Sequence, residues 1–185
     1  MKRVSVVGST GSGKTTFARE LAQVLGVPFV ELDALNWEAN WAMAPEDRFR
    51  ERVDAASRGD TWVIDGNYGG RGARDIVWPR ADTVVWLDFP LWLILARLTR
   101  RNLKRIRSGE EIWPGTGNRE TVRNSFFSTD SLYVWALRSY RRRNRLLPEI
   151  LARPEYAHLT VHRFTRSADA ASWLEAQRRP VTPRI

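Results

Sequence analysis

The sequence contains no cysteine, few lysines and histidines, and no long hydrophobic run. Without cysteine, disulfide bonds and thiolate metal sites are excluded. The longest apolar stretch, from Phe89 to Ala96, is far shorter than the roughly 20 residues that a helix needs to cross a bilayer. The apolar run that follows Met1-Lys2-Arg3 is too short for a signal peptide. We therefore expect a soluble, cytoplasmic protein.

Arginine supplies almost all of the positive charge. The formal net charge is +9, and the only lysines are Lys2, Lys14 and Lys104. Many of the arginines fall between residues 97 and 145, where few acidic residues oppose them. A local positive field of this kind attracts phosphate groups, on a nucleotide or on a nucleic acid.

A glycine-rich segment follows the first apolar run, Val4–Val7, and has the spacing G-x-x-x-x-G-K-T of a phosphate-binding P-loop. Glycines permit the tight turn, and the backbone N–H groups then surround a polyphosphate at the start of a helix. Lys14 is placed to bridge the β- and γ-phosphates, and the Thr15 hydroxyl is placed to ligate Mg²⁺. The sequence thus predicts binding of ATP and Mg²⁺. The predicted phosphate-binding residues are Gly8, Ser9, Thr10, Gly11, Ser12, Gly13, Lys14, Thr15 and Thr16.

Short apolar runs alternate with helical patterns, which favours βαβ units and a parallel sheet. The predicted strands are Lys2–Val7, Pro28–Leu32, Thr61–Ile64, Thr83–Leu87 and Leu159–Phe164. The predicted helices are Lys14–Leu25, one within 35–60, Leu91–Arg107, 120–152 with a break near Ser128–Asp130 and a kink or restart at Pro148, and Ala168–Arg178. Residues 67–80 are predicted to form a loop, and 179–185 a flexible tail after a single domain, 1–178.

Three aspartates are predicted to end strands at the edge that carries the P-loop. Either Asp65 or Asp88 fits the carboxylate that holds Mg²⁺, since each follows an apolar run. Asp33 lies on a strand further out, where a second substrate would dock. Each of the three could instead cap a loop or a helix.

The order of these motifs resembles the adenylate-kinase-like P-loop kinases. Within them, the chain is most similar to the group labelled DNA topology modulation protein, or FlaR-related, through Asp33-x-x-x-Trp37-x-x-x-Trp41 and Asp65-Gly66-Asn67-Tyr68. The resemblance implies a P-loop NTPase three-layer α/β sandwich with a five-stranded parallel sheet in the order 2-3-1-4-5. It also implies an acceptor-binding region at about 34–60 and a short lid at about 108–120.

The resemblance also implies roles for single residues. Asp65 would be the magnesium carboxylate, and Asp33 the carboxylate that orients or deprotonates the acceptor. The nucleotide-side arginines would be Arg97 and Arg101, with Arg166 bordering the adenine, and the lid arginines closing on the transferred phosphate would be Arg119 and Arg123. Asn67-Tyr68 replace the Phe-Pro of adenylate kinases, which argues against AMP as the acceptor.

The tryptophans divide into two groups. Trp62, Trp86 and Trp92 are predicted to belong to the core. Trp37 and Trp41 would either form an aromatic wall against a flat acceptor or pack the acceptor region on the sheet, and Trp113 in the lid would touch the nucleotide or a partner.

The leading hypothesis is an ATP-dependent kinase of a small molecule, with nucleotides and nucleosides among the candidate acceptors. The alternatives are a nucleotide-gated nucleic-acid-binding protein and a simple NTPase. The run Arg141–Arg143 is predicted to be a solvated helix face or a nucleic-acid contact. The sequence specifies neither the acceptor nor the oligomeric state.

Overall fold

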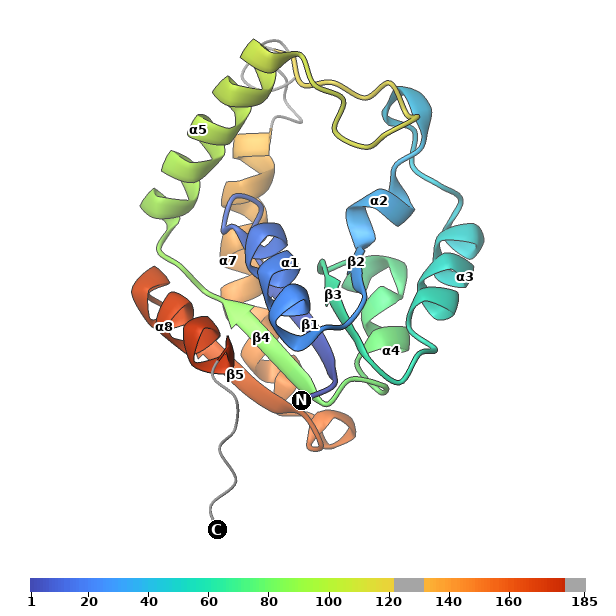
Figure 1. Ribbon diagram of the computed structural model, residues 1–185, viewed down its shortest axis with the longest axis vertical. Coiled ribbons are helices and arrows are strands. Elements are labelled where there is room, and N and C mark those ends of the chain that lie inside the picture. The colour runs from blue at the N-terminus through green and yellow to red at the C-terminus, as the bar shows by residue number, and fades with distance from the viewer. Residues whose placement is uncertain (122–131, 179–185) are drawn as a thin grey trace.

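A five-stranded, wholly parallel sheet lies between two layers of helices (Figure 1). The computed structural model describes residues 1–121 and 132–178. The sheet order is β2-β3-β1-β4-β5, which confirms the predicted fold class. The strands are β1 Arg3–Gly8, β2 Phe29–Glu31, β3 Trp62–Asp65, β4 Thr83–Leu87 and β5 Thr160–Phe164.

The helices between the strands cover both faces of the sheet. They are α1 Lys14–Leu25, α2 Leu32–Asn36, α3 Glu46–Ala56, α4 Ala73–Val77, α5 Leu91–Ser108, α7 Leu132–Leu151 and α8 Ser167–Arg178. Single 3₁₀ turns lie at Ala39–Trp41, Gly69–Arg71 and Pro154–Tyr156. None of the helices within the described ranges is both long and apolar enough to cross a membrane.

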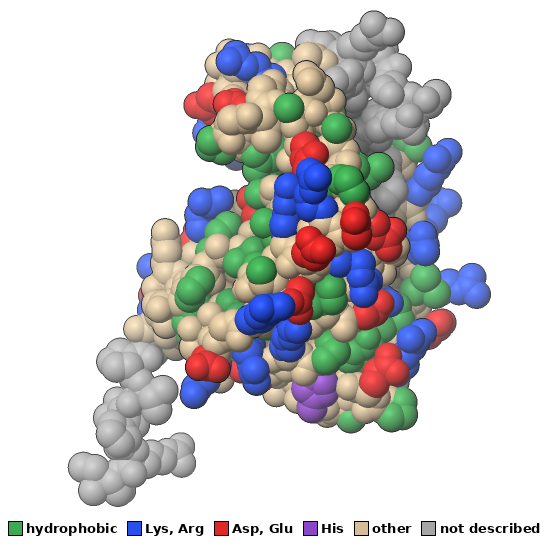
Figure 2. All heavy atoms as spheres, turned by 90° about the vertical axis from the view of Figure 1, so that its right-hand side faces the viewer, with side chains coloured by type: hydrophobic (Ala, Val, Ile, Leu, Met, Phe, Trp, Pro, Cys, Tyr) green, Lys and Arg blue, Asp and Glu red, His purple; other side chains and the backbone are tan. Residues whose placement is uncertain are grey.

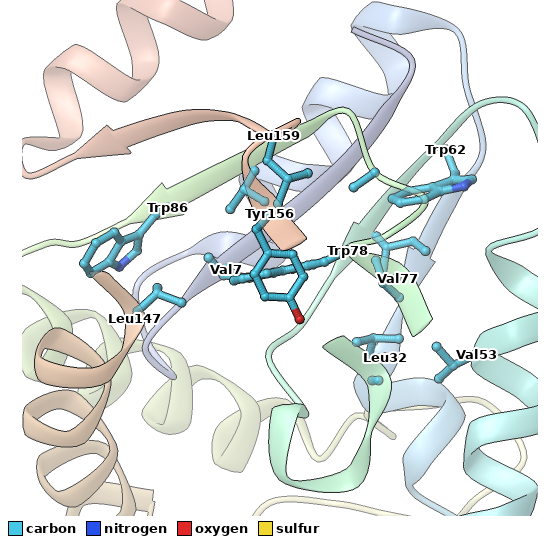
Figure 3. Close-up of a cluster of buried hydrophobic side chains, with 14 of the residues drawn as sticks. Val7, Leu32, Val53, Trp62, Val77, Trp78, Trp86, Leu147, Tyr156 and Leu159 are labelled. Carbon is cyan, nitrogen blue, oxygen red and sulfur yellow. The ribbon is translucent and has the colours of Figure 1, made fainter. Parts of the chain in front are cut away.

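Alternating residues of the central strands build two separate hydrophobic cores, because successive strand side chains point to opposite faces. On β4, Val84 and Trp86 join the core under α3, α4 and α7, while Val85 and Leu87 join the core under α1 and α8. In the first core, Trp78 meets Tyr156 edge to face at 5.0 Å (Figure 3). Two filled cores hold the sheet rigid, so the loops at its carboxyl edge have a fixed base.

The tryptophan predictions are confirmed for two residues and wrong for one. Trp62 and Trp86 are almost fully buried (Figure 3). Trp92 is 70% exposed, because it lies on the outward side of the first turn of α5 while Ile94 points into the core. A short apolar run at a helix start does not by itself show which of its residues face inward.

Three predicted boundaries also need correction. The second strand ends at Glu31, so Asp33 lies in the first turn of α2 and does not end a strand. The predicted loop 67–80 contains a 3₁₀ turn and α4. Helix α7 continues through Pro148, which interrupts only one hydrogen bond close to the helix end; the predicted break near Ser128–Asp130 lies outside the described residues.

Candidate active site

The P-loop connects the central strand β1 to α1 at the carboxyl edge of the sheet. The amide of Ser12 donates to the Ser9 carbonyl at 3.0 Å and closes the turn. Gly11 has φ 82°, and a Cβ there would lie 2.8 Å from the carbonyl oxygen of Ile94 on α5. Only glycine fits such a position. The loop leads directly into the N-terminus of α1, where backbone N–H groups favour bound phosphate.

Lys14, Thr15 and Asp65 meet beside this loop. The Thr15 hydroxyl donates to Asp65 Oδ2 at 2.5 Å, and Lys14 Nζ lies 3.7 Å from Asp65 Oδ1. Burial alone would lower the pKa of Lys14, but Asp65 and Asp33 outweigh it and raise that pKa above its ordinary value. The lysine is therefore a permanent cation at the mouth of the loop.

The same residues fit a magnesium ion. Burial raises the pKa of Asp65 despite the opposing effects of Lys14 and Thr15, and Asp65 Oδ1 is buried with no hydrogen-bond partner among the described residues. A divalent cation would stabilise the ionised carboxylate, which together with a threonine hydroxyl is the oxygen donor set that Mg²⁺ prefers. Thr15 and Asp65 would hold the ion, which would neutralise phosphate charge.

The alternative magnesium carboxylate, Asp88, is engaged elsewhere. Arg163 on β5 donates to Asp88 Oδ2 through Nε at 2.9 Å and through Nη2 at 2.6 Å. The Arg163 guanidinium also lies 4.3 Å from the centre of the Trp86 ring. Asp65 is thus the better placed of the two carboxylates for a metal.

Asn67 and Tyr68, which follow Asp65-Gly66, have roles that the sequence did not predict. The Asn67 side chain accepts from the Gly8 amide at 3.2 Å and donates to the Gly8 carbonyl at 2.8 Å. The Tyr68 hydroxyl donates to Asp33 Oδ1 at 2.6 Å. Burial and the nearby Asp33 raise the pKa of Tyr68, so its hydroxyl stays protonated and remains a donor. The end of β3 therefore fixes both the P-loop and the Asp33 carboxylate.

Removing the Asn67 amide is expected to loosen the P-loop. Asn67→Ala leaves the Gly8 N–H and carbonyl without their partners, which should lower the free energy of unfolding by about 1–3 kcal/mol. We expect ATP to bind roughly tenfold more weakly, a change of about 1.4 kcal/mol. Urea unfolding and equilibrium ATP titration measure the two effects. Gln23→Ala, at an exposed amide on α1, is the control, and equal ATP affinities in both variants would contradict the assigned role.

Of the two predicted nucleotide-side arginines on α5, Arg97 contacts the P-loop. Arg97 Nη1 donates to the Ser12 carbonyl at 2.8 Å. Burial and Arg105 lower the pKa of Arg101, while Glu120, Asp33 and Glu31 act in the opposite direction, so its guanidinium lies within electrostatic reach of Asp33 and Glu31.

A third arginine, Arg143 on α7, was missed. The sequence places it in a run that appears solvated, yet its guanidinium is half-buried and donates to the Ser9 hydroxyl. Burial lowers the pKa of Arg143 to about 10 against the pull of Asp88, so the group stays charged at neutral pH. Of the run Arg141–Arg143, the first two side chains are exposed, and the third, Arg143, points toward the P-loop.

The remaining predicted arginines are less engaged. Arg119 is exposed in the predicted lid, and its charge acts on Glu111. Arg123 lies outside the described residues. Arg166 is exposed in the turn between β5 and α8, as the sequence predicted.

The segment between α5 and α7, residues 109–121, reaches the acceptor region after α2 (Figure 1). Asn118, only 1% exposed, accepts from the Trp41 amide at 2.8 Å and donates to the Glu38 carbonyl at 2.9 Å. Asn40 and Trp41 have φ of 58° and 59°, an uncommon conformation that this contact supports. The predicted lid is thus tied to the predicted acceptor region by one amide side chain.

Loss of this amide is expected to release residues 38–41. In Asn118→Ala the Trp41 amide has no replacement acceptor, so its hydrogen exchange should accelerate about tenfold, corresponding to the roughly 1.4 kcal/mol of a buried hydrogen bond. The measurement is amide exchange followed by NMR, with the β1 and β3 amides as internal reference. Unchanged exchange at Trp41 would show that the contact contributes nothing to closure.

Comparison with known proteins agrees with this geometry. The family model described as ATPase family associated with various cellular activities (AAA) matches residues 4–65, which include the P-loop and Asp65. The shikimate kinase of Parabacteroides distasonis is 43% identical over 58 residues. That match spans about a third of each protein, 31% of this chain and 33% of the relative.

Solved structures are similar over almost the whole chain. A shikimate kinase from Acinetobacter baumannii, in complex with shikimate, has a TM-score of 0.58 at 18% identity, covering 95% of this chain and 90% of the other. A gluconokinase from Sinorhizobium meliloti 1021 has a TM-score of 0.54 at 16% identity, with coverage of 95% and 90%. At such identities the likeness concerns the fold. The chain has the P-loop NTPase fold found in small-molecule kinases.

Proposed function

We propose that the chain is an ATP-dependent phosphotransferase that acts on the hydroxyl group of a small molecule. The observation that carries this proposal is the position of Asp33. Its carboxylate is held by Tyr68 and acts electrostatically on Lys14 and Asp65, so a proton acceptor faces the phosphate-binding residues across one site.

The chemistry then follows from the contacts. The hydroxyl oxygen of the acceptor attacks the γ-phosphorus of ATP, the bond to the ADP oxygen breaks, and the hydroxyl proton passes to Asp33. Lys14 and Arg97 stabilise the phosphate charge that shifts toward ADP, and the charge of Arg101 acts on the same site. Closure of the lid excludes water, so that transfer is favoured over hydrolysis.

Two further parts of this proposal come from the sequence resemblance described above. The first is that the protein is an adenylate-kinase-like kinase, closest to the group labelled DNA topology modulation protein. The second is a single catalytic domain over residues 1–178, with an acceptor-binding region at about 34–60 and a lid at about 108–120. The contact of Asn118 with residues 38–41 supports these two regions as the walls of one site.

The test is ADP release from ATP and Mg²⁺ in the presence of a panel of acceptors. The panel consists of nucleosides, nucleoside monophosphates, amino sugars and hydroxy acids, with a reaction lacking any acceptor as baseline. Stimulation by one member, with a phosphorylated product detected by mass spectrometry, supports the kinase. A slow rate that no acceptor changes would favour a simple NTPase.

One observation favours a second candidate, a nucleic-acid-binding protein. Exposed basic residues form a row along α5, and another row lies on α7; each row lines a shallow surface hollow. The first row is Arg100, Lys104 and Arg107, and the second is Arg141, Arg142 and Arg145. On the side that bears α3, by contrast, basic and acidic side chains are interspersed (Figure 2).

Salt dependence tests this second candidate. DNA binding driven by phosphate contacts should weaken steeply between about 50 and 200 mM salt and should change when ATP is added. Absence of DNA binding at about 50 mM salt would exclude the nucleic-acid-binding function.

A further inference from the structure

Arginines from two helices contact the same turn of the P-loop. Arg97 on α5 donates to the Ser12 carbonyl at 2.8 Å, and Arg143 on α7 donates to the Ser9 hydroxyl. The two ends of this turn are themselves joined, since the Ser12 amide donates to the Ser9 carbonyl. Ser9 is only 3% exposed, so the contact with Arg143 lies below the molecular surface. Helix α7 thus contributes a cation to the loop from a distant part of the sequence.

The surroundings of Arg143 do not balance its charge. Within the described residues its guanidinium forms no ion pair, and Asp88 is the acidic group that acts on it. That carboxylate is already bound by Arg163, whose Nη2 lies 2.6 Å from Asp88 Oδ2. One negative charge therefore serves two guanidinium groups. Burial lowers the pKa of Arg143 more than Asp88 raises it, as expected for a buried charge that lacks a full partner.

Arg143 also interrupts an apolar face of its helix. Ala136, Tyr140 and Leu147 lie seven and three residues before it and four residues after it, and all three are buried or packed against a core. Residues with these spacings share one face of an α-helix. The other arginines of α7 are exposed. A charge on the inward face departs from the pattern that favours folding, and such departures are expected at functional sites.

The chemistry of a guanidinium group suits a phosphate ligand. It presents five N–H donors in a rigid fork, which can bind two phosphate oxygens at once. The Ser9 hydroxyl engages only Nη1 of Arg143, and in the described part of the chain no other group accepts from this guanidinium. The loop that contains Ser9 leads into the N-terminus of α1, where backbone N–H groups favour phosphate. The incompletely balanced cation and the expected anion therefore belong to the same place.

We propose that Arg143 is a further phosphate-binding residue, which donates to oxygens of the nucleotide phosphates when ATP is bound to the P-loop. Ser9 holds the guanidinium beside the loop, and the phosphate charge balances the excess that Arg143 and Arg163 leave over Asp88. The inference rests on the nucleotide-binding part of the proposed function. It adds a cation from α7 to Lys14 of α1 and Arg97 of α5.

The first test replaces Arg143 by glutamine, which removes the charge and keeps a polar amide. ATP affinity, measured by calorimetry with Mg²⁺ present, should fall at least about tenfold, as expected for the loss of a charge-assisted hydrogen bond. Without nucleotide, the midpoint of thermal unfolding should stay unchanged or rise, because a buried charge without a full partner no longer opposes folding. Arg138→Gln, at an exposed position on the same helix, is the matched control. Equal ATP affinities in the two variants overturn the proposal.

Two further variants separate contact with the phosphates from support of the loop. Ser9→Ala leaves the charge of Arg143 in place, so ATP affinity should fall less than about threefold. Arg143→Lys keeps the charge without the fork, so it should bind ATP at least about threefold more tightly than Arg143→Gln does.

Three results would show that Arg143 acts only through the structure of the loop, and each overturns the proposal. The first is a loss of ATP affinity in Ser9→Ala as large as that in Arg143→Gln. The second is equal ATP affinity in Arg143→Lys and Arg143→Gln. The third is an Arg143→Gln protein that fails to fold or unfolds well below Arg138→Gln without nucleotide.

Because these experiments measure binding, they are separate from the test of the proposed function. If an acceptor is phosphorylated and Arg143→Gln binds ATP as tightly as Arg138→Gln, the kinase proposal stands and this inference fails. If Arg143→Gln binds ATP weakly as expected but no acceptor is phosphorylated by the unmodified protein, this inference stands and the kinase proposal fails. If the unmodified protein binds no ATP, both fail.

Discussion

Phosphoryl transfer should fall by about a thousandfold or more when Lys14 is replaced by alanine, because the site loses a buried cation at the point where phosphate charge develops. ATP affinity should fall as well, since the ammonium group interacts with the nucleotide before and during the reaction. Coupled measurement of ADP release gives the first effect, and equilibrium titration with ATP gives the second.

The chain provides a direct control for this experiment, since only two other lysines occur in it. Lys2→Ala removes an exposed ammonium group just before the start of β1, at the opposite end of the strand from the P-loop, and should behave as the unmodified protein. Lys14→Met keeps the length of the side chain, so loss of activity in both Lys14 variants assigns the effect to the charge. Turnover at the unmodified rate in either Lys14 variant would exclude the P-loop from catalysis.

The second large effect is expected at Asp33. Asp33→Asn keeps the size of the side chain and an oxygen for Tyr68, but removes the group that accepts the proton. Turnover should fall by about 10²–10⁴-fold, the usual contribution of a general base, while ATP affinity changes less than twofold. The ratio of the two changes separates a role in chemistry from a role in nucleotide binding.

Two further variants sharpen the interpretation of Asp33. Tyr68→Phe keeps the carboxylate but removes its hydrogen bond, so the loss of turnover should be smaller and should not affect ATP affinity. Asp47→Asn, in the exposed first turn of α3, is the neutral reference. If Asp33→Asn transferred phosphate at the rate of Asp47→Asn, proton transfer would have to occur elsewhere.

The positions of the strands and the turn of the P-loop could be predicted because local sequence determines them, whereas the strand order followed from the resemblance to P-loop kinases. The P-loop spacing requires glycine where backbones approach, as at Gly11 against α5, and the motif therefore has a strong signature. The alternation of Val84, Val85, Trp86 and Leu87 between two cores likewise follows from the strand period.

The contacts that complete the site could not be predicted, because they join residues far apart in the chain. Arg143 reaches Ser9 across 134 positions, and nothing in a run of three arginines shows which one turns inward. Asn118 reaches Trp41 across 77 positions, and a buried asparagine in a glycine-rich loop has no distinguishing local pattern. Asn67 had a signal in the motif Asp65-Gly66-Asn67-Tyr68, but its pairing with Gly8 required the register of β1 beside β3.

The contact between Asn118 and residues 38–41 has a consequence for how the specificity of this protein can diverge. Asn118 holds the acceptor region by the backbone groups of Glu38 and Trp41, and backbone groups do not change when a side chain is substituted. Mutations at residues 37–43 can therefore alter which compound is selected while that closing contact is retained. A protein built in this way can acquire a new substrate by changes on one wall, with the machinery for phosphate transfer left untouched.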